Sequence, residues 1–113
     1  MSNREHKDEE LLYHILEAIE NVAAHQSSGG TKFTIERAII YELVIIGEAV
    51  SDLSKTLKES YPKVPWQVIA DTRHKMVHDY EDVSSRVVWN IVEEHLPELK
   101  RNIQNIAKEK QGK

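Results

Sequence analysis

The sequence predicts an all-α protein, an antiparallel bundle of four or five helices, on the basis of three observations. Apolar residues recur at steps of three and four along most of the 113 residues, which is the spacing of one face of a helix. Only 4 glycines and 3 prolines interrupt the chain, and no stretch shows the apolar–polar alternation of a strand. The breaks between periodic segments are short, so neighbouring helices are expected to run antiparallel.

The composition predicts one soluble domain over residues 1–113, with residues 1–7 and 108–113 expected to fray. Hydrophobic residues make up 40% and charged residues 30%, as in ordinary globular proteins. Cysteine is absent, which excludes disulfides and thiolate metal sites and fits a cytoplasmic location. The charged N-terminus does not resemble a secretory signal, and the most apolar stretch, residues 38–50, is too short to span a membrane.

The first two helices are expected at about residues 8–25 and at about residues 31–60, separated by the loop 27–30. The main apolar stripe of the second helix is formed by Ile35, Ile39, Leu43, Ile46, Val50, Leu53 and Leu57. Four further apolar residues lie off that stripe: Ile40, Tyr41, Val44 and Ile45. A helix that is apolar over most of its girth is buried on more than one side, and the second side is expected to be a subunit interface. Gly47, inside this helix, predicts close helix packing rather than a catalytic role.

The remaining helices follow two proline-containing breaks. Residues 61–65 end the second helix, and Pro65 can begin a third that runs to about Val77. Asp82 or Ser84 can cap a fourth helix, and Pro97 either kinks it or begins another.

The segment 71–80 is chemically distinct, because it holds two imidazoles, a guanidinium, a phenol and two carboxylates. At about 100° per residue, Arg73, His74 and His78 fall on one arc of the third helix, with Asp71 at its edge. Apolar residues such as Met76 fall on the other side and are expected to face the bundle. The side chains on the arc can therefore converge on one groove.

Arginine and histidine together suit phosphodiester cleavage without a metal or another cofactor. A guanidinium can hold a phosphate through two parallel hydrogen bonds, and an imidazole can take the proton of a ribose 2′-hydroxyl or give one to the leaving oxygen. Attack by the 2′-hydroxyl would confine the activity to RNA. One catalytic histidine per chain leaves the acid or the base unfilled, and a two-fold dimer would join two sets of Arg73 and His78.

Other interpretations remain open at this point. His74 and His78, four residues apart, have the spacing of a two-histidine metal site, whose third ligand would be Asp71, Asp79 or a more distant residue. A non-catalytic helical dimer that binds a nucleotidyltransferase or a nucleotide is a further possibility. The net charge of −4 argues against broad, non-specific binding of nucleic acid, so contact with RNA would have to be local. Aromatic residues are expected to be core or interface anchors: Trp66, Trp89 and Tyr41.

Residues 73–80 read R-H-K-M-V-H-D-Y and resemble the R-x-x-x-x-H-x-Y signature of HEPN domains of the HepT type. Three other segments agree with that family in order and spacing: 45–54, 64–66 and 88–99. The resemblance covers nearly the whole chain.

The resemblance implies a homodimeric ribonuclease toxin whose antitoxin is a small nucleotidyltransferase of the MNT type. It places Arg73 and His78 in an RNA-cleaving site at the dimer cleft, and it makes Tyr80 the phenol to which the antitoxin transfers AMP. The residue after the arginine is often asparagine in the family, whereas here it is His74, so a direct role for this histidine stays open. The basic residues nearest to the motif, and hence the expected contacts to RNA, are Lys63, Lys75 and Arg86.

Overall fold

The computed structural model describes residues 3–78 and 84–111, and these residues contain helices and no strand. The elements are α1 (Asn3–Gln26), α2 (Lys32–Asp52), α3 (Lys55–Ser60), α4 (Trp66–His78), α5 (Ser85–Asn90), the π-helical segment η1 (Ile91–His95) and α6 (Leu96–Gln111). The predicted all-α class is confirmed.

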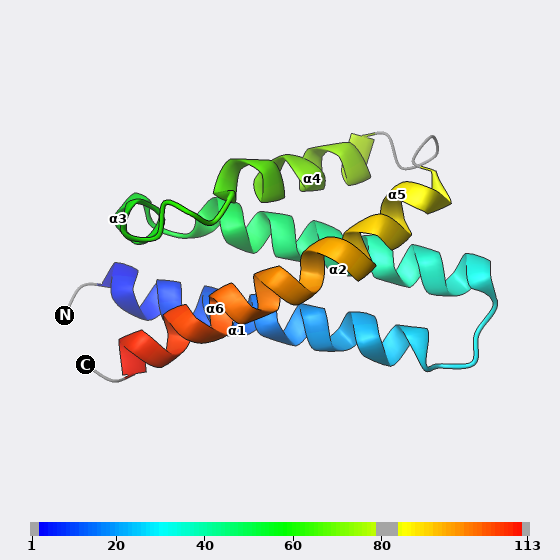
Figure 1. Cartoon of the computed structure of the whole chain (residues 1–113), viewed down its shortest axis with the longest axis horizontal. Coiled ribbons are helices and arrows are strands. Elements are labelled where there is room, and N and C mark those ends of the chain that lie inside the picture. Colours follow the sequence, from blue (N-terminus) through cyan, green and yellow to red (C-terminus); the bar gives the residue numbers. More distant parts are fainter. Residues whose placement is uncertain (1–2, 79–83, 112–113) are drawn as a thin grey trace.

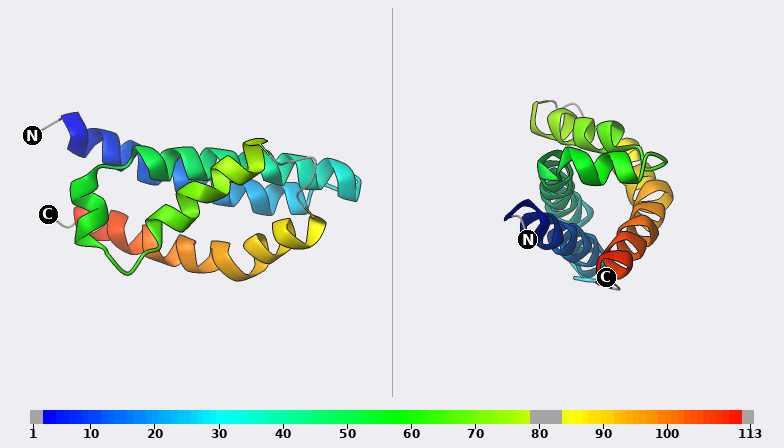
Figure 2. Two further views of the ribbon diagram at one scale, coloured as in Figure 1. Left: turned by 90° about the horizontal axis from the view of Figure 1, so that it is seen from above. Right: turned by 90° about the vertical axis from the view of Figure 1, so that its left-hand side faces the viewer.

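The long helices α1 and α2 form an antiparallel hairpin, and the other elements pack around it (Figure 1). The elements α5, η1 and α6 follow one another as a single curved rod, whose α6 portion lies along α1 (Figures 1 and 2). Helix α4 packs on α2 and runs antiparallel to it. The bundle therefore has α2 at its centre, in contact with α1 on one side and α4 on another.

One hydrophobic core joins these helices, and it contains the stripe predicted for residues 35–57. Six of the seven stripe residues are buried, and Ile35 packs at the margin of the core. The off-stripe residues Ile40, Val44 and Ile45 are half-buried, whereas Tyr41 is exposed. Among the residues that the structure describes, no helix is both long and apolar enough to cross a membrane.

The expectation of one helix from about residue 31 to 60 is wrong, because the chain breaks at Leu53 and Ser54. Leu53 is extended, with ψ of 146°, and the Ser54 hydroxyl accepts a hydrogen bond from the amide of Leu57 as the N-cap of α3. The buried carboxylate of Asp8, in α1, accepts hydrogen bonds from the amide of Ser54 at 2.9 Å and from its hydroxyl at 2.6 Å. A contact from a distant helix thus fixes a break that the apolar stripe alone does not reveal.

The ends of the other helices lie close to the predicted positions, except in α1, which begins at Asn3 rather than near residue 8. Helix α4 covers residues 66–78, against an expectation of 65–77. Ser84 caps α5, as one of the two predicted alternatives, by accepting a hydrogen bond from the amide of Val87.

Pro97 is the second residue of α6, the helix that directly follows the π-helical turn η1. The amide of Leu96 bonds to the carbonyl of Ile91, five residues back. Proline has no amide hydrogen and its ring crowds the preceding turn, so a widened turn lets the rod continue past it. Helix α6 begins at Leu96 without a loop after η1, so of the two alternatives the structure favours a continuous rod that is bent near Pro97.

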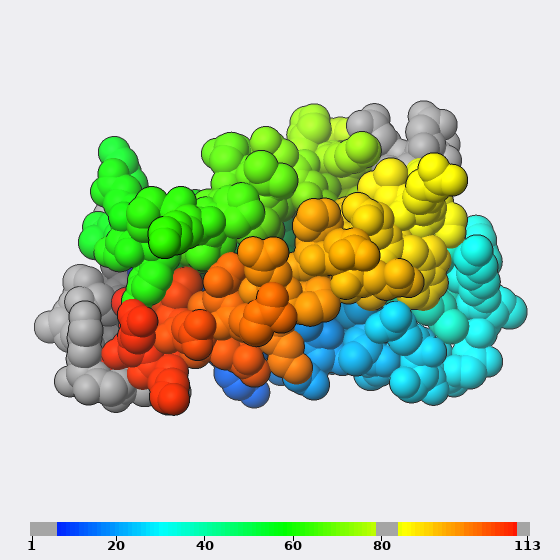
Figure 3. All heavy atoms as spheres, in the orientation of Figure 1, coloured from blue at the N-terminus to red at the C-terminus, as the bar shows by residue number. Residues whose placement is uncertain are grey.

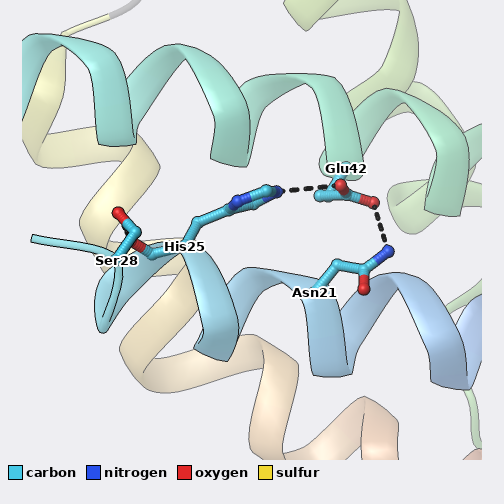
Figure 4. Close-up of polar contacts among 4 residues, drawn as sticks. All are labelled: Asn21, His25, Ser28 and Glu42. Atoms are coloured by element: carbon cyan, nitrogen blue, oxygen red, sulfur yellow. Dashed lines mark hydrogen bonds and ion pairs between the residues drawn. The ribbon is translucent and has the colours of Figure 1, made fainter. Parts of the chain in front are cut away.

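A polar cluster joins α1 to α2 near their connecting loop (Figure 4). Glu42 is buried in α2, and its carboxylate lies 3.0 Å from Nε2 of His25 and accepts a 3.4 Å hydrogen bond from the side-chain amide of Asn21. A buried carboxylate needs such partners to offset its loss of hydration. The cluster fixes the register of the hairpin and lies on the α1 side of α2.

Candidate active site on helix α4

The candidate site is built where α4 crosses α2 at Gly47. A Cβ atom placed on Gly47 would lie 2.4 Å from the Cβ of Arg73 and 3.1 Å from its Cα. Only glycine permits this approach, so the expectation that Gly47 serves close helix packing is confirmed. The same contact fixes the start of the Arg73 side chain against α2.

The guanidinium of Arg73 lies beside a carboxylate that the sequence analysis did not assign. Nε of Arg73 is 3.5 Å from Oε1 of Glu48, the residue that follows Gly47. The two side chains are 42% and 54% exposed, so the ion pair lies at the surface. Within the described part of the chain, this Nε is buried and has no hydrogen-bond partner. The sequence feature that could have indicated Glu48 is its position, as a charged residue inside the most apolar stretch of the chain.

His74 and His78 lie together at the C-terminal end of α4. Their ring centroids are 4.4 Å apart and the rings are inclined by 44°, as expected for residues one helical turn apart. Both side chains are exposed, so their ring nitrogens can reach a substrate. The structure therefore brings the two imidazoles together on the arc that also carries Arg73.

The other predicted site residues are more dispersed. Asp71 accepts a 2.9 Å hydrogen bond from Gln67, so its carboxylate is directed toward the start of α4 rather than toward the histidines. Lys63 is exposed in the turn before α4, at the opposite end of that helix from His78. Arg86 is exposed in α5. Asp79 and Tyr80 lie outside the described residues.

Lys75 lines an apolar groove between α4 and the α5–η1–α6 rod, visible as a hollow in Figure 3. The groove has a volume of about 280 Å³, and buried residues such as Leu43 and Met76 line it. Neither Arg73 nor either histidine of α4 reaches it. We place the candidate chemistry at the exposed Arg73–His78 surface rather than in this groove, because most of the residues that line the groove are apolar and its polar residues, such as Lys75 and His95, do not include an arginine.

The side chains of the described residues do not form a metal site. Across residues 3–78 and 84–111, no group of three or more histidine, aspartate or glutamate side chains is arranged to hold a metal ion. His74 and His78 are close to each other, but a third ligand does not join them within those ranges. Asp79, the nearest sequence candidate for that ligand, is not among the described residues.

A carboxylate that the sequence analysis did not single out holds the beginning of α5 against α2. Oε1 of Glu36 accepts hydrogen bonds from the hydroxyl of Ser85 and, at 2.7 Å, from the indole of Trp89. These two donors lower the pKa of Glu36 from its ordinary value of 4.5. Trp89 is thus an anchor between helices, as predicted, and Trp66 is buried in the core with its indole bonded to backbone carbonyls.

Exposed apolar residues adjoin the Arg73 surface. Val77 lies one helical turn beyond Arg73 in α4 and is 42% exposed, and Tyr41 in α2 is 64% exposed. Because α4 runs antiparallel to α2 with Arg73 over Gly47, the residues after Arg73 follow the part of α2 that precedes Gly47. The off-stripe side of α2 thus remains partly uncovered, as expected of a helix with two apolar faces.

The comparisons with known proteins show which family the chain resembles. The protein-family model described as "Ribonuclease HepT-like" matches residues 11–106. A Methanocaldococcus jannaschii protein named "Putative RNase MJ1216" is 33% identical over 108 residues, 91% of this chain and 89% of its own length. No solved structure gives a significant match.

Two further relatives match over shorter spans. A Caldanaerobacter subterraneus protein named "Putative RNase TTE0752" is 40% identical over 72 residues, and the match spans 64% of each chain. The "Probable ribonuclease HepT" of Thermococcus cleftensis is 38% identical over 71 residues, which is 64% of its length. The match with residues 11–106 covers α2, the crossing at Gly47 and all of α4, and on that basis the chain belongs to the HepT-like ribonuclease family.

Proposed function

We propose that this chain is a metal-independent endoribonuclease that cleaves RNA with Arg73 and His78 at the cleft of a homodimer. The observation that carries the proposal is the seating of Arg73 on Gly47, at the base of an exposed helix end that also bears two histidines. Membership of a ribonuclease family supports the same reaction.

The reaction follows from the chemistry of these side chains. Arg73 binds the scissile phosphate and neutralises the charge that develops on it. One imidazole accepts the proton of the 2′-hydroxyl while that oxygen forms a bond to phosphorus. The bond from phosphorus to the 5′-oxygen breaks, and a second imidazole gives its proton to the leaving oxygen. The products are a 2′,3′-cyclic phosphate and a 5′-hydroxyl.

The second imidazole has two possible sources, His74 of the same chain and His78 of a second copy. The exposed apolar residues Tyr41 and Val77 support association at this surface, because a dimer formed there would cover them and set two Arg73–His78 pairs beside one another. Lys63, Lys75 and Arg86 are proposed to contact RNA outside the cleft, and Asp71 to act only in support.

Cleavage of labelled RNA in the presence of EDTA tests this proposal. We expect Arg73→Ala and His78→Ala to abolish cleavage while the helical circular dichroism spectrum is unchanged. His14→Ala, an exposed histidine of α1, is the matched control and should cleave normally. Loss of activity on chelation would favour a metal site at His74 and His78, and absence of any cleavage would favour a non-catalytic interaction module.

We further propose that the ribonuclease is the toxin of a toxin–antitoxin pair and is neutralised by transfer of AMP to Tyr80. The support is the resemblance of residues 73–80 to the family signature, since Tyr80 lies outside the described residues. Incubation with an MNT-type nucleotidyltransferase and ATP should add the mass of one AMP to Tyr80 and stop cleavage. Tyr80→Phe should remain unmodified and active in the same mixture.

A further inference from the structure

The ion pair between Glu48 and Arg73 has two opposite effects at the proposed site: it attracts the arginine and it places a negative charge where RNA would bind. Glu48 follows Gly47 in α2, so the close approach that seats Arg73 also brings this carboxylate to 3.5 Å from Nε. RNA brings its own negative charge to the same guanidinium. A carboxylate at that place therefore repels the substrate while it attracts the residue that binds the substrate.

The atom at which the contact is made resolves this conflict. The carboxylate lies 3.5 Å from Nε, the nitrogen next to the aliphatic stem. Nε is buried, whereas the side chain as a whole is 42% exposed, so part of the residue remains open to solvent. An arginine held at Nε keeps a planar fork with further N–H donors that can bind a phosphate.

We propose that Glu48 is a positioning residue for Arg73 in RNA cleavage, an inference that rests on the proposed ribonuclease function. Glu48 attracts the guanidinium by its charge from the side of Nε, without a hydrogen bond to that atom, and so favours one position of the fork against α2. It also lowers the affinity of the site for RNA by the repulsion of one negative charge. The two effects act on different kinetic constants, because orientation governs the chemical step and net charge governs binding.

The variant Glu48→Gln separates these effects, because glutamine keeps the size of the side chain and removes its charge. We expect kcat to fall by about tenfold or more, since a small displacement of a positioned group slows the chemical step strongly. We expect KM for RNA to fall by about threefold, the effect of one charge at a solvent-exposed pair. A loss confined to folding would change neither constant per folded molecule in this opposed way.

Asp52→Asn is the matched control for the loss of one negative charge on α2. Asp52 lies one turn beyond Glu48, is exposed, and forms no ion pair with Arg73. It should leave kcat unchanged. Equal kinetic constants for Glu48→Gln and Asp52→Asn would overturn the inference while leaving the ribonuclease function intact.

A binding experiment tests the pair without cleavage. The probe is a 2′-O-methyl RNA, which lacks the nucleophilic hydroxyl, and its Kd is measured for the wild type, Glu48→Gln, Arg73→Ala and the double variant. Because the carboxylate repels RNA and also occupies the guanidinium, Glu48→Gln should tighten binding in both backgrounds, but by a larger factor when Arg73 is present, which is the signature of direct coupling. Equal tightening in both backgrounds would contradict a role through Arg73. If the wild type binds this RNA but cuts no RNA, the proposed function fails independently of the coupling.

Discussion

At the scale of single residues, the candidate site depends on Gly47, a residue that has no side chain. The absence of a Cβ at position 47 allows α4 to approach α2 until the backbone of Arg73 lies in contact distance. The atoms that a new Cβ would meet belong to the base of Arg73 and to its backbone, which cannot rotate away as the end of a long side chain could. Gly47 therefore controls the position of the proposed phosphate-binding residue.

Gly47→Ala is expected to lower both stability and RNA cleavage. Alanine gains about 1 kcal/mol of helix propensity over glycine, whereas overpacking of this kind costs about 1–3 kcal/mol. The net loss in urea unfolding should therefore be about 0–2 kcal/mol, with a larger effect on kcat because Arg73 is displaced. Gly30→Ala is the control, since its nearest neighbour would be at 3.5 Å. A Gly47→Ala protein with wild-type kcat would show that the α2–α4 approach does not position the arginine.

A second residue-scale prediction concerns the clamp made by Glu36. Hydrogen bonds from Ser85 and Trp89 lower the pKa of this carboxyl in the folded protein below its ordinary value of 4.5. The charged form therefore adds stability that is fully present above pH 4.5 and is lost as the pH falls through the lower folded-state pKa. We expect the stability advantage of the wild type over Glu36→Gln to be largest near neutral pH and to shrink on acidification, as measured by urea unfolding over that range.

The control for this pH dependence is Glu59→Gln, which removes one negative charge from the exposed surface of α3. If both variants show the same trend against the wild type, the change reflects net charge rather than the two hydrogen bonds. Loss of the clamp should also raise amide hydrogen exchange in α5, because Glu36 joins that helix to α2.

At the scale of elements, the short helix α3 exists because of its first residue. Six residues are too few to form a stable helix in isolation, so α3 depends on its cap and on the burial of Leu57. Ser54 supplies the cap, and Asp8 of α1 accepts hydrogen bonds from both its amide and its hydroxyl. Ser54 thus lies at the break between α2 and α3, caps α3 and joins this region to α1.

Ser54→Ala is expected to reduce the free energy of unfolding by about 1–2 kcal/mol, the upper part of the range for loss of an N-cap. The reason for the upper part is that the buried Asp8 carboxylate also loses one of its donors. Ser60→Ala serves as the comparison, because its hydroxyl bonds to the carbonyl of Thr56 at the exposed end of the same helix. Equal effects of the two substitutions in thermal or urea unfolding would contradict the role of Ser54.

At the scale of the whole molecule, the features that depend on local sequence patterns could be predicted from the sequence. The features that depend on a contact with a residue far away in the sequence could not. The apolar stripe of residues 35–57 and the cap at Ser84 depend on spacing and on nearby groups, and both predictions agree with the structure. The break at Ser54 depends on Asp8, 46 residues away in sequence, which no periodicity encodes. For the same reason the arc of α4 was predictable, whereas the partner of Arg73 was not, because it belongs to another helix.

Cleavage at a dimer cleft depends on the association of two chains, which can be tested directly. Tyr41→Glu places a charge at an exposed aromatic residue of α2. If this surface is the centre of a dimer, the substitution should weaken association by about thirtyfold or more, since a central interface residue contributes about 2 kcal/mol or more. Sedimentation velocity should then show a dimer for the wild type and a monomer for the variant, with cleavage lost in parallel. Tyr13→Glu is the matched control, because Tyr13 in α1 is also 64% exposed and lies on another helix. A wild type that sediments as a monomer while it cleaves RNA would leave His74 as the second imidazole and remove the need for a partner chain.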